Sequence, residues 1–166
     1  MSQPSPVTPS AASPAQVLRR FRQVFGAVRS QFAQIEKRTG LGGAQLWALS
    51  LVQQRPGIGM GELARLMDVH QSTASNLVKG LVLRELLEAG KHGPDRRAVQ
   101  LSLLPAGARL LRRAPGPAEG VLPQALQNLD AETLARLDGD LGRLIELLGA
   151  DARAANIPLS ESGRAT

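Results

Sequence analysis

The sequence contains no cysteine, and only four of its 166 residues are aromatic: Phe21, Phe25, Phe32 and Trp47. Without thiols the chain can form no disulfide bond, and a sensor that works by cysteine oxidation is excluded. With so few aromatic side chains and only four isoleucines, the core must consist mainly of Leu, Val and Ala. That composition favours packed helices over a β-sandwich.

The groups that enzymes and metal sites use are also scarce. The two histidines, His70 and His92, are too few for a histidine-based metal site within one subunit, so we expect no metal and no cofactor. The sequence has no glycine-rich phosphate loop and no thiol nucleophile. Glu62 and Asp68 lie six residues apart on a short predicted helix and do not converge. The sequence therefore does not predict an enzyme.

Long apolar runs are missing as well. No segment approaches the roughly 18 consecutive apolar residues of a transmembrane helix, and the N-terminus lacks an apolar signal core. We therefore expect a cytoplasmic protein with no membrane partner. At about 150 residues per domain, the length predicts a single domain at 15–150. The Ser/Pro/Ala-rich residues 1–14 predict a disordered tail, and residues 151–166 a flexible one.

The segment 70–84 predicts an amphipathic helix. Four apolar residues recur at helical spacing, which places them on one face: Ala74, Leu77, Val78 and Leu81. The remaining face has no carboxylate and carries Gln71, Ser72, Thr73, Ser75, Asn76 and Lys79. Amides and hydroxyls can meet base edges and a Lys can meet phosphate, so this face suits the major groove of DNA. An ordinary polar surface helix remains the alternative.

Within that face, the amides of Asn76 and Gln71 are the best candidates for base reading, because an amide can bind adenine through two hydrogen bonds. Ser72, Thr73 and Lys79 could equally hold phosphates. A short predicted helix at 62–67 precedes this segment, joined to it by a three-residue turn. Two short helices with such a connection predict a helix-turn-helix.

The segment after this pair predicts a β wing. Val99, Leu101 and Leu103 alternate with polar residues, which indicates a strand with one buried face, and Ile58 is expected to add a short strand. Before them, the predicted turn carries Asp95, Arg96 and Arg97. An Arg at a strand tip fits an A·T-rich minor groove, and a phosphate contact suits Arg96. A solvated charged hairpin tip is the alternative.

Helices on both sides of this unit predict a homodimer. Helix 15–38 carries an apolar stripe, and the region 105–150 ends in a helix that Asp130 caps. The apolar side of that last helix consists of Leu134, Leu137, Leu141, Leu144, Ile145 and Leu148. Packing this stripe against its symmetry mate would bury it, whereas packing under the winged unit is the alternative. The predicted fold is therefore mainly α with a small β wing (α+β): a winged helix-turn-helix at about 41–104 with N- and C-terminal dimerisation helices.

The net charge of +6 is uneven along the chain. Residues 1–54 contain six Lys/Arg and one acid, whereas residues 101–166 contain seven Lys/Arg and eight acids. Basic charge beside a helix-turn-helix predicts double-stranded DNA as the partner. A winged helix that binds another protein without specific DNA binding is the alternative.

The residues GELARLMDVHQSTASNLVKGLVLRELL, followed by DRRAVQLSLLPAG, resemble the MarR family of bacterial transcription regulators. The resemblance spans roughly residues 16 to 150. It implies that 70–84 is the recognition helix, that Arg97 enters the minor groove, and that Asp95 orients it. It also implies an obligate homodimer on an inverted-repeat operator, with repression as the default outcome and a small ligand, often an aromatic anion, that relieves binding. Arg20 is a candidate to neutralise such a ligand, and Trp47 to line its cavity.

Two positions depart from the family's pattern. Glu85 stands where the family usually has Gly after the recognition helix, and Leu104 stands where it usually has a Thr cap. Loss of a Thr cap costs about 1 kcal/mol, although Pro105 at the first helical position is favourable. Neither residue lies on the predicted DNA-facing surface.

Overall fold

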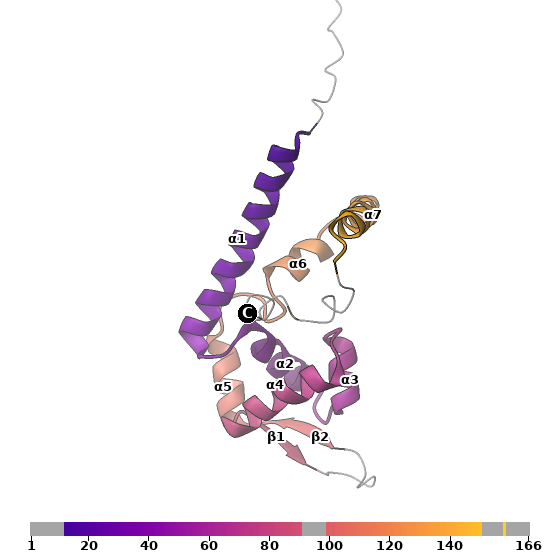
Figure 1. Cartoon of the computed structure of the whole chain (residues 1–166). Helices are drawn as coiled ribbons and strands as arrows, with labels where there is room; N and C mark the ends of the chain where they lie inside the picture. Colours follow the sequence, from indigo (N-terminus) through magenta and orange to yellow (C-terminus); the bar gives the residue numbers. More distant parts are fainter. Residues whose placement is uncertain (1–11, 91–98, 151–157, 159–166) are drawn as a thin grey trace, which may run out of the picture.

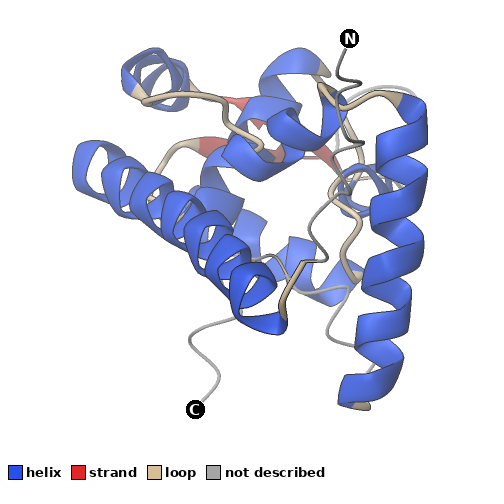
Figure 2. Ribbon diagram, turned by 90° about the horizontal axis from the view of Figure 1, so that it is seen from above, coloured by secondary structure: helices blue, strands red, loops and turns tan. Residues whose placement is uncertain are grey.

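The computed structural model describes residues 12–90, 99–150 and 158. These residues form helices and one small sheet, as the sequence predicts (Figure 1). Seven helices and two strands follow in this order: α1 Pro14–Thr39, α2 Gly43–Gln54, α3 Met60–Leu66, α4 Gln71–Leu83, β1 Leu87–Gly90, β2 Gln100–Leu103, α5 Pro105–Arg113, α6 Val121–Gln127 and α7 Ala131–Leu148. Figure 2 shows how small the two strands are within the helical molecule. Of the expected tails at 1–14 and 151–166, residues 1–11, 151–157 and 159–166 lie outside the described residues.

The core forms around α2. Leu46, Leu49 and Val52 of this helix are completely buried, and they pack with Leu63 of α3 and Leu81 of α4. Burying one such side chain contributes about 1.5–3 kcal/mol, so α2 fixes the two helices of the helix-turn-helix in place. In Figure 1 this unit and the strands occupy the lower end of the molecule, and α1, α6 and α7 extend from it.

The predicted helix-turn-helix is present. The predicted apolar residues of α4, from Ala74 to Leu81, are all buried, so its amphipathic pattern is confirmed. The connection between α3 and α4 turns sharply because Asp68 adopts a left-handed conformation with φ 52°. Asp tolerates this region better than most residues do.

The wing is an antiparallel pair in which Leu87 lies opposite Leu103 and Gly90 lies opposite Gln100. The expected third strand is a single bridge between Gly59 and Gln100, supported by a 3.0 Å hydrogen bond from the Leu101 N–H to the Ile58 carbonyl oxygen. The expectation that Val99 is buried is wrong, since 40% of it is exposed. The ladder ends at Gln100, so Val99 lies beyond the part of the sheet that covers the core.

The helices outside the winged unit are only partly covered. The C-terminal half of α1 is buried at Val28, Gln31 and Ile35, whereas Phe25 in its N-terminal half is half exposed and stacks on Phe21 at 6.1 Å. Helix α7 has no buried residue. The alternative in which the leucines of α7 pack under the winged unit is therefore wrong.

A short helix, α6, lies between α5 and α7 and begins at Val121. Gly120 precedes it with φ 113°, a conformation that no other residue type adopts easily, so the helix cannot start earlier. Asp130 caps α7 as predicted, with its Oδ1 accepting a 2.8 Å hydrogen bond from the Thr133 N–H.

Candidate nucleic-acid interface

The exposed side of α4 presents most of the predicted DNA-binding residues together. Gln71, Ser72, Ser75, Asn76 and Lys79 are exposed, and Thr73 is half-buried. At 100° per residue, Ser72, Asn76 and Lys79 form a stripe opposite the buried face, and Gln71 and Thr73 lie at its edges. The helix contains no Asp or Glu. A polar surface without carboxylates can approach DNA phosphates without like-charge repulsion.

The start of α4 adds positive electrostatic potential to this surface. No side chain caps its first turn, so the first backbone N–H groups remain available for an external acceptor. The N-terminus of a helix carries a partial positive charge that favours phosphate. Gln71 and Ser72 lie at that end, which makes phosphate contacts there physically reasonable.

Gln45 is a residue beside this surface that the sequence did not single out. It lines a shallow pocket of about 210 Å³ together with Thr73 and Asn76. Its Oε1 accepts a 3.3 Å hydrogen bond from the Gly42 N–H. Its Nε2 lies so close to Gly80 of α4 that a Cβ added to this glycine would be only 2.9 Å away. The amide of Gln45 is therefore held against α4. Only tertiary packing brings it there, although the Gly42–Gln45 capping pattern could have indicated a fixed side chain.

The predicted wing tip, Asp95, Arg96 and Arg97, lies outside the described residues. Their roles stay predictions from the sequence. The structure describes the strands on either side, whose last pair is Gly90 with Gln100.

Two polar contacts hold the elements behind the interface. The Arg84 Nη1 at the end of α4 donates a 2.6 Å hydrogen bond to the carbonyl oxygen of Gly40. Arg55 after α2 pairs with Glu62 of α3 at 2.8 Å. Both members of that ion pair are well exposed, so it stabilises the fold by at most about 1 kcal/mol. These contacts position α3 and α4.

The two predicted ligand residues do not meet. Trp47 lines a cavity of about 130 Å³ between α1, α2 and the start of α6, together with Phe32 and Gln31. Arg20 lies on the exposed N-terminal half of α1, where it lines a separate groove with Arg19. The lining of the Trp47 cavity includes Glu119 and no Lys or Arg. An anion would therefore find no cationic partner among the described residues that line this cavity.

Gln31 closes one side of the Trp47 cavity with two hydrogen bonds. Its Nε2 donates to the Pro117 carbonyl oxygen at 3.2 Å, and its Oε1 accepts from the Val121 N–H at 2.7 Å. Because Gln31 is buried, both hydrogen bonds satisfy polar atoms of its amide that would destabilise the fold if they were left without a partner. They join α1 to the segment before α6.

Other kinds of site find little support in the described ranges. No group of three or more His, Asp or Glu side chains in them could hold a metal ion. None of their helices is long and apolar enough to cross a membrane.

The comparisons with known sequences point to regulators of transcription. A family model of the MarR family matches residues 39–98. The chain is similar to an uncharacterized HTH-type transcriptional regulator of Bacillus subtilis, YsmB, with 23% identity over 78% of this chain and 89% of that protein. It is also similar to a proposed transcriptional regulatory protein for the hcr operon of Thauera aromatica, with 32% identity over 60% of this chain and 56% of that protein. Both names describe regulators and not enzymes.

Solved structures show the same fold. A MepR-like protein crystallised with pseudoligands superposes with a TM-score of 0.56 and 21% identity, covering 81% of this chain and 92% of that one. MepR of Staphylococcus aureus bound to DNA gives a TM-score of 0.54 and 15% identity, covering 82% and 96%. At these identities the likeness shows the winged-helix fold alone.

Proposed function

We propose that this chain, whose segment 39–98 matches a model of the MarR family, is a transcription regulator of that family. In this proposal it represses transcription as a homodimer on an inverted-repeat operator, from which a small ligand releases it. Such a regulator works where the chromosome lies, so we place it in the cytoplasm. The exposed face of α4 is the observation that carries the DNA-binding part of this proposal.

That face has the composition that base reading needs. Asn76 lies at its centre, where its amide could bind adenine through two hydrogen bonds, and Lys79 lies one turn further on for a phosphate. A bidentate contact of this kind discriminates between bases by about 1–3 kcal/mol. A protein with the same fold, MepR, has been solved in complex with DNA, which supports DNA as the partner.

The wing tip would add a second contact. Arg97 would enter the minor groove with Asp95 orienting it, and Arg96 would bind phosphate. The antiparallel ladder of β1 and β2 supports this part, because it supplies the two strands that such a tip connects.

The uncovered apolar side chains of α7 and α1 support the homodimer. On α7, Leu134, Leu144, Ile145 and Leu148 lie on one side and are between 36% and 69% exposed. Arg136 and Arg143 lie on the opposite side of the helix at 100° per residue. Each leucine buried between two copies contributes about 2 kcal/mol, so this stripe and its symmetry mate would hold a stable dimer.

A ligand would act by preferring one arrangement of the two winged units. A molecule lowers DNA affinity only if it binds better to the arrangement that does not match the operator. The Trp47 cavity lies between α1 and α2, where such a preference could be expressed. The pseudoligands bound to the MepR-like relative support a ligand site in this fold.

One observation favours the alternative of a protein-binding winged helix. Leu83, on the same side of α4 as Asn76, is 76% exposed, and the neighbouring Val82 is 36% exposed. An exposed apolar pair is common in protein interfaces. It occupies only the C-terminal end of α4, however, and leaves the polar stripe unexplained.

Selection of bound duplexes from a random library tests the proposed function. We expect enrichment of an inverted repeat whose half-sites lie about one helical turn apart, as two recognition helices require. Sedimentation should show a dimer that Leu144→Glu with Leu148→Glu dissociates, whereas the matched variant Arg136→Glu with Arg143→Glu stays dimeric. No enrichment, with DNA binding that disappears at moderate salt, would favour the protein-binding alternative.

A further inference from the structure

Pro158 follows the last helix in the sequence, yet it lies against the middle of the fold. It is the one residue after Ala150 that the structure describes, and it lines the Trp47 cavity together with residues of α1, α2 and α6. It is half-buried there. We propose that the Trp47 cavity is the docking site of the chain's own segment 156–160, Asn-Ile-Pro-Leu-Ser, with Pro158 at its centre.

The composition of this segment differs from that of the residues around it. Ile157 and Leu159 are the only branched aliphatic side chains in 151–166, and they flank the only proline of that stretch. The nearest charged residues are Arg153 before the segment and Glu161 after it. Apolar side chains gain free energy when an apolar surface removes them from water. Ile157 and Leu159 lie outside the described residues, so their contacts are part of the proposal.

A proline at the centre suits an aromatic surface. Its ring fixes φ and restricts the preceding residue to extended conformations, so little conformational entropy is lost when such a segment binds. Segments that contain proline dock on aromatic surfaces elsewhere for this reason. The Trp47 cavity offers Phe32 of α1 and Trp47 of α2, which are both partly buried and packed against the hydrophobic core.

The cavity does not require a polar or charged occupant. The amide of Gln31 already binds the Pro117 carbonyl oxygen and the Val121 N–H. In the described part of the chain, every fully buried side-chain nitrogen or oxygen has a hydrogen-bond partner. Glu119 belongs to the lining and disfavours a carboxylate beside it. An uncharged aliphatic segment meets all three conditions.

The size of the cavity also favours a short piece of chain. Its volume of about 130 Å³ is well below the roughly 300–1,000 Å³ of an ordinary small-molecule site. Pro158 already forms part of its wall, and Ile157 and Leu159 are held next to it by the backbone. An aliphatic side chain from one of these two neighbours therefore suits the remaining space better than a drug-sized molecule does.

A docked segment would join three helices at one point. The cavity lies between α1, α2 and the start of α6, and α2 is the helix around which the core of the winged unit forms. In Figure 1 the winged unit lies below this junction, and α1 and α6 extend from it. A ligand would reach the cavity only by displacing the segment. That last consequence rests on the proposed function, whereas the docking itself does not.

The composition of the chain allows a direct test in solution. Trp47 is the only tryptophan, and the chain has neither tyrosine nor cysteine, so Ser160→Cys provides a single site for a nitroxide label. A nitroxide quenches tryptophan emission only at short range. We expect the label at position 160 to quench Trp47 strongly in the full chain. The same label introduced through Thr166→Cys, six residues further on, should quench it weakly.

A pair of matched variants tests whether the aliphatic side chains hold the segment in place. Ile157→Asp with Leu159→Asp would put two carboxylates beside Glu119 in an apolar cavity, which is unfavourable. Gly163→Asp with Ala165→Asp adds the same charges at the same spacing outside the segment. We expect the first variant to lose most of the quenching and to lower the Tm of the unlabelled chain by about 4 °C or more, because two aliphatic side chains return to water. The control should keep both values.

Several outcomes would overturn the proposal. Equal quenching from positions 160 and 166 would do so, as would quenching and a Tm that Ile157→Asp with Leu159→Asp leaves unchanged. Quenching that disappears after subunit exchange with an excess of unlabelled Trp47→Phe chain would assign the occupant to a second copy. No quenching at all in the purified chain would leave the cavity to another molecule. Operator binding by the wild type is measured separately and decides the proposed function alone.

Discussion

The Arg84 Nη1 and the Gly40 carbonyl oxygen are joined by a hydrogen bond of 2.6 Å, although the two residues lie 44 positions apart in the sequence. Gly40 ends α1 with φ 68°, and Arg84 follows the last residue of α4. A charged donor bound to a backbone carbonyl forms one of the stronger hydrogen bonds in a protein. This contact therefore fixes the end of the candidate recognition helix to the helix that extends away from the winged unit.

Removing the donor should loosen this connection. Arg84→Met keeps much of the apolar stem and loses the hydrogen bond, so we expect the free energy of unfolding to fall by about 1 kcal/mol. The Tm should fall by about 2–4 °C for a chain of this length. Arg65→Met on α3, where the structure records no side-chain partner among the described residues, is the control for lost charge. Equal losses in the two variants would contradict a role for the Gly40 contact.

Replacing Glu85 by Gly should stabilise the protein. Glu85 has φ 56°, a left-handed conformation that costs an ordinary residue about 1–2 kcal/mol and a glycine almost nothing. Part of this gain is lost because glycine also makes the unfolded chain more flexible. We expect a net increase of about 0.5–1 kcal/mol in denaturant unfolding.

Asp68→Gly is the matched comparison for Glu85→Gly. Asp68 has a similar φ of 52°, but Asp adopts this region more readily than Glu does. The gain from Asp68→Gly should therefore be smaller. If Glu85→Gly destabilises the protein, the side chain of Glu85 has a stabilising role that outweighs its backbone strain.

Gly107 should not tolerate even a methyl group. A Cβ at this position would collide with the Leu86 carbonyl oxygen and lie 2.8 Å from Cδ1 of Leu103. Gly107→Ala should therefore lower the free energy of unfolding by about 1–3 kcal/mol or more. Gly139→Ala on α7 is the control, because nothing lies within 4 Å of its Cβ, and this substitution should stabilise the helix by about 1 kcal/mol. Equal responses at the two positions would contradict the close packing of α5 on the wing.

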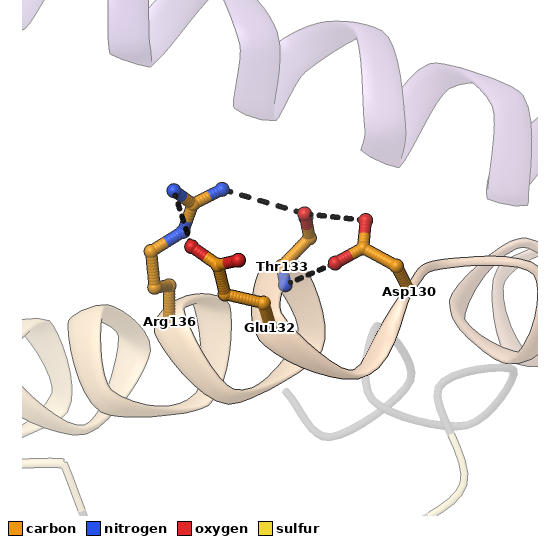
Figure 3. Close-up of polar contacts among 4 residues, drawn as sticks. All are labelled: Asp130, Glu132, Thr133 and Arg136. Carbon is orange, nitrogen blue, oxygen red and sulfur yellow. Dashed lines mark hydrogen bonds and ion pairs between the residues drawn. The ribbon is translucent and has the colours of Figure 1, made fainter.

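Asp130 should titrate below its ordinary pKa (Figure 3). The N–H of Thr133 and then its hydroxyl, which donates to Oδ2 at 2.7 Å, stabilise the carboxylate and lower the pKa of Asp130 below 3.8. A lowered pKa stabilises the folded state above pH 3.8, and this contribution disappears as the pH falls through the folded value. Thr133→Val removes the hydroxyl but keeps the N–H, so the pKa of Asp130 should rise part of the way to 3.8.

Carboxyl chemical shifts in an acid titration measure this pKa directly. Thr133→Ser keeps a hydroxyl at the same position and serves as the control, with a pKa close to that of the wild type. An Asp130 that titrates at 3.8 in the wild type, or that does not respond to Thr133→Val, would contradict the cap.

The helices could be predicted from the sequence because local rules determine them. Helical periodicity alone defines the buried face of α4, which consists of Ala74, Leu77, Val78 and Leu81. The cap formed by Asp130 depends only on the first turn of the helix that it precedes. The exposed polar face of α4 followed from the same periodicity. The prediction that Val99 is buried was wrong, because the alternation of apolar and polar residues does not reveal where the ladder of a sheet ends.

The contacts that join distant segments could not be predicted in this way. Gln45 beside Asn76, Gln31 bound to Pro117, and Arg84 bound to Gly40 each depend on how the helices pack. Arg20 and Trp47 were paired by their chemistry, and the structure places them in separate cavities.

Fluorescence anisotropy on the selected duplex tests the DNA-binding role of α4 most directly. Asn76→Ala should weaken binding by about 1–3 kcal/mol and relax the preference at one base position. Lys79→Gln should weaken binding to all sequences alike and lower the salt slope by about one. Arg97→Ala should weaken binding to duplexes with A·T-rich flanks, and Gln127→Ala and Arg143→Gln serve as matched controls. If Asn76→Ala and Lys79→Gln bind as tightly and as selectively as the wild type, α4 does not read the operator, and the central claim is contradicted.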